Sequence, residues 1–89
     1  MKKLPDIVSR QFGKSIKGLR VQLGLSQELF ALKAGIDRSF VGKLERGERQ
    51  ATITTFIKVA AVLNVLPSEL MKESLDQLYL DINDGDFNE

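Results

Sequence analysis

The sequence of 89 residues contains neither cysteine nor histidine. Without cysteine the chain can form no disulfide and offers no thiolate nucleophile. Without histidine it lacks a common zinc ligand and the usual general base of enzymes. These two absences argue against an enzyme, against a metal site and against a bound cofactor, and we predict no small-molecule ligand.

Long hydrophobic runs are also missing. No window approaches the roughly 18 consecutive apolar residues of a membrane span, and the first ten residues, MKKLPDIVSR, lack the apolar run of a secretory signal. We therefore expect a cytoplasmic protein with no membrane partner. A chain of this size forms one domain that buries about 60–65% of its extended surface, so a partner subunit would add to its stability.

The charges are divided unevenly along the chain. Residues 1–50 contain eleven Lys or Arg against five Asp or Glu, whereas residues 51–89 contain two against seven. The net charge of +1 conceals this division. A basic front and an acidic back indicate that one end of the molecule faces a polyanion, although chance can produce such a division in a short chain.

Two short helices joined by a tight turn are predicted between Ser26 and Gly47. Ser26 is a good N-cap for the first helix, and Gly35 is a typical stop. Asp37 can cap a second helix after only about three residues of turn. This spacing predicts a helix-turn-helix.

The second of these helices has one polar and one apolar side. On a wheel of about 100° per residue, Val41 and Leu44 share the apolar side. The polar side is basic and carries Arg38, Ser39, Gly42, Lys43 and Arg46. An ordinary surface helix has the same pattern, so the wheel alone leaves a solvated face and a binding face both open.

The whole stretch resembles the Cro/repressor-type (XRE-like) helix-turn-helix of transcription regulators. The matching positions are Gln27, Ala31, Gly35, Val41, Leu44 and Glu45. The string DRSFVGKLERGER also resembles the recognition helices of controller proteins from restriction-modification systems. The resemblance implies an all-α, compact five-helix domain of the lambda-repressor-like DNA-binding type, with the helix-turn-helix as its second and third helices.

The function that this resemblance implies is sequence-specific transcription regulation. Such a protein binds double-stranded DNA as a homodimer at a palindromic operator and acts as a repressor, an activator or both. The alternative is a protein-interaction module, such as an antitoxin whose main partner is another protein. Apolar residues in excess after Pro67 and an acidic C-terminal segment motivate this second hypothesis.

The residues that would contact DNA divide into two sets. Arg38, at the tip of the recognition helix, can donate to guanine O6 and N7 together. The predicted base contacts are Arg38, Ser39 and Lys43, and the predicted backbone contacts are Gln27, Arg46, Arg49 and Gln50. Phe40 either braces the helix or meets a thymine methyl, and Gly42 leaves space for a closer approach to DNA.

A further residue pair is implied by the resemblance. In the family, an arginine at the position of Arg20 pairs with the glutamate that corresponds to Glu45, and thereby joins the first helix to the recognition helix. The alternative is that these two residues are independent surface charges.

The flanking segments predict three more helices. The first begins near Pro5, ends at Gly24 and has an apolar stripe of Val8, Phe12, Ile16, Leu19 and Leu23. A fourth begins at Thr52 or Thr54 and ends at Asn64. We expect its core face to consist of Ile53, Phe56, Ile57, Ala60 and Leu63. Val59 and Val62 fall off that face, so they are either loosely covered or contact a partner.

The fifth helix, residues 67–82, has more apolar residues than one stripe requires. We expect it to form a dimer interface through Leu75, Leu78, Tyr79 and Ile82, unless it simply caps the core. The domain then spans residues 1–82, and residues 83–89 form an acidic flexible tail.

Overall fold

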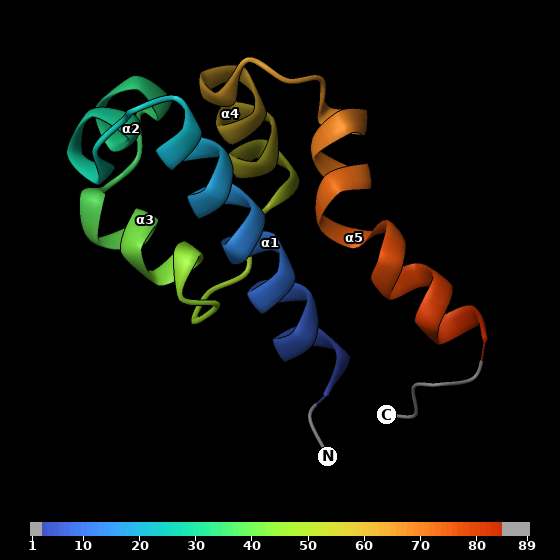
Figure 1. Cartoon of the computed structure of the whole chain (residues 1–89). Helices are drawn as coiled ribbons and strands as arrows, with labels where there is room; N and C mark the ends of the chain where they lie inside the picture. Colours follow the sequence, from blue (N-terminus) through green and yellow to red (C-terminus); the bar gives the residue numbers. More distant parts are fainter. Residues whose placement is uncertain (1–2, 85–89) are drawn as a thin grey trace.

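The computed structural model describes residues 3–84 and contains five α-helices joined by short loops (Figure 1). The helices are α1 (Leu4–Gln22), α2 (Gln27–Ala34), α3 (Arg38–Glu45), α4 (Ile53–Leu63) and α5 (Pro67–Asn83). The predicted all-α fold, with the helix-turn-helix as its second and third helices, is confirmed. The tail is expected to begin at residue 83, but α5 continues to Asn83. Residues 85–89 of the predicted tail lie outside the described part of the chain.

Local chemistry sets the helix boundaries largely as the sequence indicates. The hydroxyl of Ser26 accepts a hydrogen bond from the amide of Leu29 at 3.0 Å and caps α2. Gly35 ends α2 with φ at 68°, a left-handed conformation that glycine adopts without strain. Of the two candidate caps for α4 the structure uses Thr52, which accepts from the amide of Thr55 at 3.1 Å.

Helix α1 is the central element of the fold. It contacts α3, α4 and α5, while α2 packs against α3 and α4. α5 runs antiparallel to α1, and α3 and α5 lie on opposite sides of it (Figure 1). The recognition helix and the proposed dimerisation helix are therefore separated by α1. The described molecule measures 40 × 23 × 22 Å.

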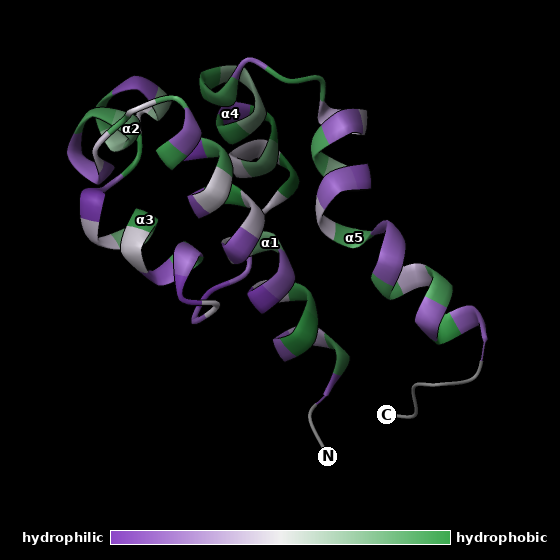
Figure 2. Ribbon diagram, viewed as in Figure 1, coloured by the Kyte–Doolittle hydropathy of each residue, from purple (hydrophilic) through white to green (hydrophobic). Residues whose placement is uncertain are grey.

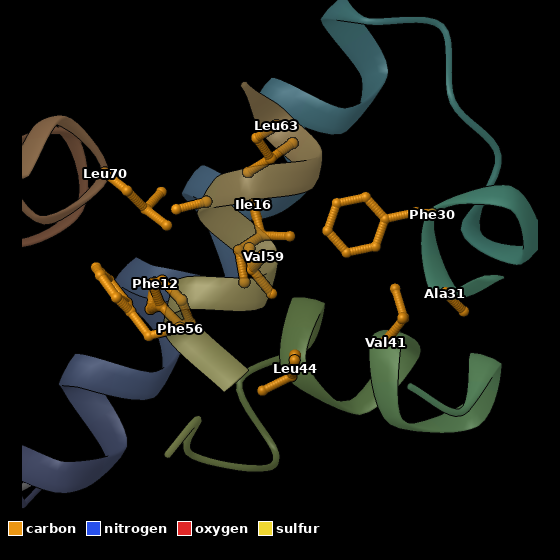
Figure 3. Packing of buried hydrophobic residues seen from close by; sticks show 11 residues of the cluster. Phe12, Ile16, Phe30, Ala31, Val41, Leu44, Phe56, Val59, Leu63 and Leu70 are labelled. Carbon is orange, nitrogen blue, oxygen red and sulfur yellow. The ribbon is translucent and has the colours of Figure 1, made fainter. Parts of the chain in front are cut away.

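The core is built from residues of all five helices, which point toward a common centre (Figure 3). Its least exposed large side chains are Ile16, Phe30, Val41, Leu44, Val59 and Leu70. The rings of Phe12 and Phe56 stack at a centroid distance of 5.2 Å and join α1 to α4. This cluster fixes the position of α3, because Val41 and Leu44 belong to it.

The predicted core face of α4 is wrong by part of a turn. Val59 is fully buried, whereas Ile53 and Ile57 are 72% and 52% exposed. α4 is apolar along most of its length (Figure 2), so periodicity does not distinguish its faces. The packing of α1, α2 and α5 selects the face that contains Phe56, Val59, Ala60 and Leu63.

The predicted stripe of α1 is also too long by one residue. Leu23 is 50% exposed, because α1 ends at Gln22 and Leu23 lies beyond the last turn that packs on the core.

No single helix in residues 3–84 is long and apolar enough to cross a membrane. Only α4 and α5 taken together are long and apolar enough for a membrane span, and the chain bends by 108° between them.

Candidate nucleic-acid interface

The two sides of α3 have different environments. Val41 and Leu44 face the core with 0% and 1% of their surface exposed. On the other side Arg38 and Ser39 are exposed and Lys43 is partly buried. The helix therefore presents a basic face to its surroundings while its apolar face holds it in the domain.

Phe40 lies at the border between these sides. It is partly buried and packs against the core cluster. Of the two roles considered for Phe40, this position supports bracing of α3.

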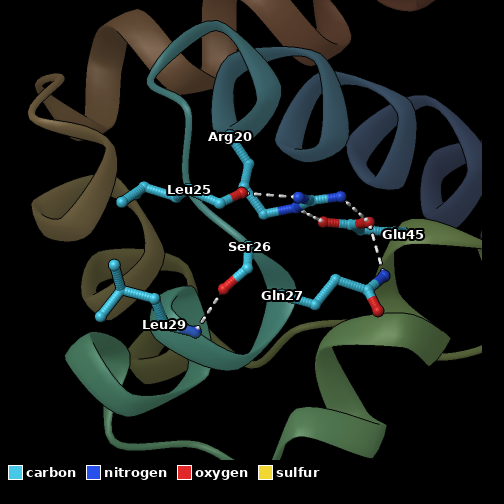
Figure 4. Close-up of polar contacts among 6 residues, drawn as sticks. All are labelled: Arg20, Leu25, Ser26, Gln27, Leu29 and Glu45. Carbon is cyan, nitrogen blue, oxygen red and sulfur yellow. Dashed lines mark hydrogen bonds and ion pairs between the residues drawn. The ribbon is translucent and has the colours of Figure 1, made fainter.

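A buried ion pair joins α1 to the C-terminal end of α3 (Figure 4). Arg20 Nε donates to Glu45 Oε2 at 2.6 Å, and its Nη2 donates to Glu45 Oε1 at 3.0 Å. The two side chains are only 10% and 3% exposed. The hydrogen bonds to Glu45 raise the pKa of Arg20 further above its usual value. The arginine thus holds the carboxylate in a bidentate geometry that fixes both distance and direction.

Two further hydrogen bonds extend this pair into a network (Figure 4). Arg20 Nη1 donates to the carbonyl of Leu25 at 2.7 Å, in the loop that enters α2. Gln27 Nε2 donates to Glu45 Oε1 at 3.0 Å from the first turn of α2. The network therefore connects α1, the start of α2 and the end of α3, and it sets the orientation of the recognition helix.

Gly13 marks a second contact between α1 and α3. A Cβ atom at this position would overlap the backbone carbonyl oxygen of Leu44 and would lie 2.8 Å from that of Glu45. The two helix backbones thus approach more closely than any residue with a side chain permits. Sequence reasoning assigned no role to Gly13. The available signal was a glycine inside a helical pattern, which costs about 1 kcal/mol relative to alanine and so usually has a packing reason.

Three of the predicted DNA-contacting residues have free side chains. Arg38, Lys43 and Arg49 make no hydrogen bond or ion pair within residues 3–84. Arg38 lies in the first turn of α3 and Arg49 in the loop that follows it. Arg38 and Arg49 can therefore meet a ligand without losing an internal partner, whereas the charge of Lys43 also acts on the nearby carboxylate of Glu48.

The other predicted contacts have partners inside the protein. The amide of Gln27 is bonded to Glu45, as described above. Arg46 pairs with Glu48 at 2.7 Å, and Gln50 Nε2 donates to the carbonyl of Pro5 at 3.2 Å.

Ser39 is also engaged, through the residue at the N-cap of α3. Its hydroxyl donates to Asp37 Oδ2 at 3.3 Å. Asp37 occupies the predicted cap position, but its side chain makes no capping hydrogen bond to α3. A helical wheel places such residues on a face but does not reveal what their side chains bond.

The predicted dimer residues of α5 lie in two environments. Leu75, Leu78 and Ile82 are partly buried, whereas Tyr79 is 65% exposed. Leu78 lines a groove against Ile7 of α1. The excess of apolar residues on α5 is thus smaller than expected, because α1 covers part of it.

An apolar groove lies beside Leu75, between α5, α1 and the start of α4. Its volume is about 200 Å³, and Ile53 and Met71 contribute to its lining. Met71 is 42% and Ile53 is 72% exposed. We call Ile53, Met71, Leu75 and Tyr79 the α5 face.

A helix-turn-helix with a basic outer face is the arrangement by which proteins of this class enter the major groove of DNA. Residues 16–70 match the helix-turn-helix family HTH_3. The chain belongs to this family and is a DNA-binding transcription regulator. The match begins inside α1 and ends in the first turn of α5, so it leaves most of α5 outside.

Controller proteins are among the relatives of this chain. It is 34% identical over 64 residues to control protein C.MunI from a Mycoplasma species, covering 71% of this chain and 86% of that one. It is 35% identical over 63 residues to control protein C.SmaI of Serratia marcescens, covering 70% and 75%. The crystal structure of the restriction-modification controller protein C.AhdI from Aeromonas hydrophila superposes with a TM-score of 0.68 at 42% identity, covering 70% and 94%.

Proposed function

We propose that the protein controls the genes of a restriction-modification system by binding a palindromic operator as a homodimer. The observation that carries this proposal is the exposed basic face of α3, which is held in place by the buried pair of Arg20 and Glu45. The similarity to control proteins of such systems supports the choice of regulated genes.

In the proposed complex, α3 enters the major groove by its N-terminal end. Arg38 bonds a guanine edge, while Ser39 and Lys43 contact neighbouring bases. The sugar-phosphate backbone is contacted by the second predicted set, which consists of Gln27, Arg46, Arg49 and Gln50. The first turn of α2 also offers backbone amides that have no partner within the helix, and such amides suit a phosphate.

The proposed dimer forms through the α5 face. Ile53 and Met71 are exposed side chains that line the same groove. The exposed Tyr79 follows Met71 and Leu75 at intervals of four residues, which places it on the same face of α5. A second copy that covers these side chains would bury area now in contact with water. Because α5 lies across α1 from α3, contact there leaves both recognition helices free. A copy of 40 × 23 × 22 Å is compatible with two α3 helices placed about 34 Å apart, one turn of DNA.

Replacing Tyr79 with aspartate is expected to weaken the dimer at least tenfold, since it puts a charge into an apolar contact. Sedimentation equilibrium should show twice the chain mass of 10.0 kDa for the original protein and a shift toward the single mass for the variant.

Leu32→Asp is the matched control, because Leu32 is 78% exposed on α2, away from the α5 face. A single-chain mass for the unaltered protein at all concentrations would contradict the dimer. Equal effects of both substitutions would contradict its placement on α5.

The function is tested by selecting bound duplexes from a random pool and locating the selected sequence in the source genome. We expect a palindrome ahead of genes for a restriction enzyme or its methyltransferase, with binding that weakens steeply as salt increases. A stable one-to-one complex with a companion protein, combined with no salt-sensitive duplex binding, would favour the antitoxin alternative instead.

A further inference from the structure

A carboxylate lies within the basic surface at the end of α3. Arg46 Nε donates to Glu48 Oε2 at 2.7 Å, and Arg46 Nη2 lies 3.3 Å from Glu48 Oε1. The two side chains are 59% and 53% exposed. The hydrogen bonds from Arg46, together with the nearby charge of Lys43, lower the pKa of Glu48. Its carboxylate, like that of any exposed glutamate, is ionised at neutral pH. Glu48 therefore offsets part of the positive charge that α3 presents to DNA.

The same pair determines what covers Gly42. A Cβ atom at Gly42 would lie 3.0 Å from Arg46 Nη1 and 3.8 Å from its Cζ. The guanidinium group thus lies across the middle of α3, and Gly42 is buried. The space that the sequence left open for DNA at this position is filled by Arg46 in the free protein.

We propose that Glu48 competes with the DNA backbone for Arg46. In the free protein it keeps Arg46 folded over Gly42, and a phosphate takes the guanidinium group when DNA binds. This transfer uncovers Gly42, where the absence of a side chain then permits close approach of α3 to the groove. The inference rests on the proposed placement of α3 against DNA.

The competition from the Glu48 carboxylate weakens DNA binding, and a glutamine at this position would remove that effect. Each subunit exchanges an ion pair within the protein for one with phosphate and leaves the Glu48 carboxylate near other phosphates. Replacing Glu48 with glutamine releases Arg46 and removes that repulsion. Because phosphate contacts do not depend on base sequence, the gain should be similar on the selected duplex and on random duplex.

The test compares the affinities of four variants with that of the unaltered protein on both duplexes, across a range of salt concentrations. Glu48→Gln should tighten binding about three- to tenfold at low salt and steepen the salt dependence by about one unit of slope per subunit. Glu73→Gln makes the same charge change at an exposed position of α5 and should leave the affinity unchanged. In the Arg46→Ala background, Glu48→Gln should give less than half of its gain, since Arg46, the cation that Glu48 binds, is no longer there to be released.

The possible failures are distinguishable. If the unaltered protein binds duplex DNA with salt sensitivity but Glu48→Gln binds no more tightly, the competition is refuted and the proposed function stands. The same conclusion follows if the gain persists in full without Arg46. If the unaltered protein shows no salt-sensitive duplex binding, the proposed function fails, and this inference fails with it.

Discussion

Replacing Gly13 with alanine is expected to destabilise the protein by about 3 kcal/mol or more, near the upper end of the usual effect of overpacking. The added methyl group would overlap the backbone oxygen of Leu44. A flexible side chain could rotate away, but a backbone carbonyl can move only if α3 shifts as a whole. Such a shift would also displace the recognition helix. Urea unfolding should therefore show a lower midpoint with little change in slope, and DNA affinity should fall at temperatures where the variant is still folded.

Gly18 in the same helix provides the matched control. No atom lies within 4 Å of a Cβ placed there, so Gly18→Ala should stabilise the protein by about 0.5–1 kcal/mol through the preference of the helix for alanine. Opposite signs for the two substitutions would locate the effect in the contact between α1 and α3. A stability loss below about 1 kcal/mol for Gly13→Ala, a typical value for point substitutions, would contradict the close approach of these helices.

Removing one partner of the buried ion pair between Arg20 and Glu45 is expected to destabilise the protein by about 3–5 kcal/mol. Arg20→Met leaves the carboxylate of Glu45 with only the amide of Gln27, in a site where that side chain is 3% exposed. Desolvation of an unpaired charge is the main cost, so the loss should persist at high salt. The measurement is the free energy of unfolding in urea at low and high ionic strength.

The double variant Arg20→Met with Glu45→Leu provides the control for this prediction. It removes both charges and keeps similar volumes, so it should be more stable than the single variant Arg20→Met. Its affinity for DNA should still be reduced, because the bidentate geometry that orients α3 is lost. The single variant Glu45→Leu completes the cycle. If the losses of the two single variants add up to the loss of the double variant, the residues act independently, as separate surface charges would.

The fold could be predicted from the sequence where local chemistry decides it. Ser26, Gly35 and Thr52 act through their own hydroxyl groups or backbone conformation, and each acts where the sequence indicates. The face of α4 could not be predicted in this way, because Val59 and Ile57 are equally apolar. Which of them is buried depends on where α1, α2 and α5 pack, and this is a property of the whole core.

The candidate site shows a similar division. The periodicity of α3 separates Val41 and Leu44 from the basic residues, and burial follows that separation. Contacts between residues distant in sequence, such as Gly13 with Leu44, leave no mark in helical periodicity. The hydrogen-bond partners of Arg46 and Gln50 were likewise not predictable. Long polar side chains have several neighbours within reach, and a helical wheel does not show which of these neighbours they bond.

The proposal that α3 reads bases is tested most directly by Arg38→Ala, with Arg49→Ala as the comparison. Affinities of both variants are measured on the selected duplex and on random duplex. Arg38→Ala should lose about 1–3 kcal/mol on the selected duplex, lose much less on random duplex and relax the preference at one base position. Arg49→Ala should weaken both duplexes alike and flatten the salt dependence. Equal losses on both duplexes for Arg38→Ala would contradict base reading by α3.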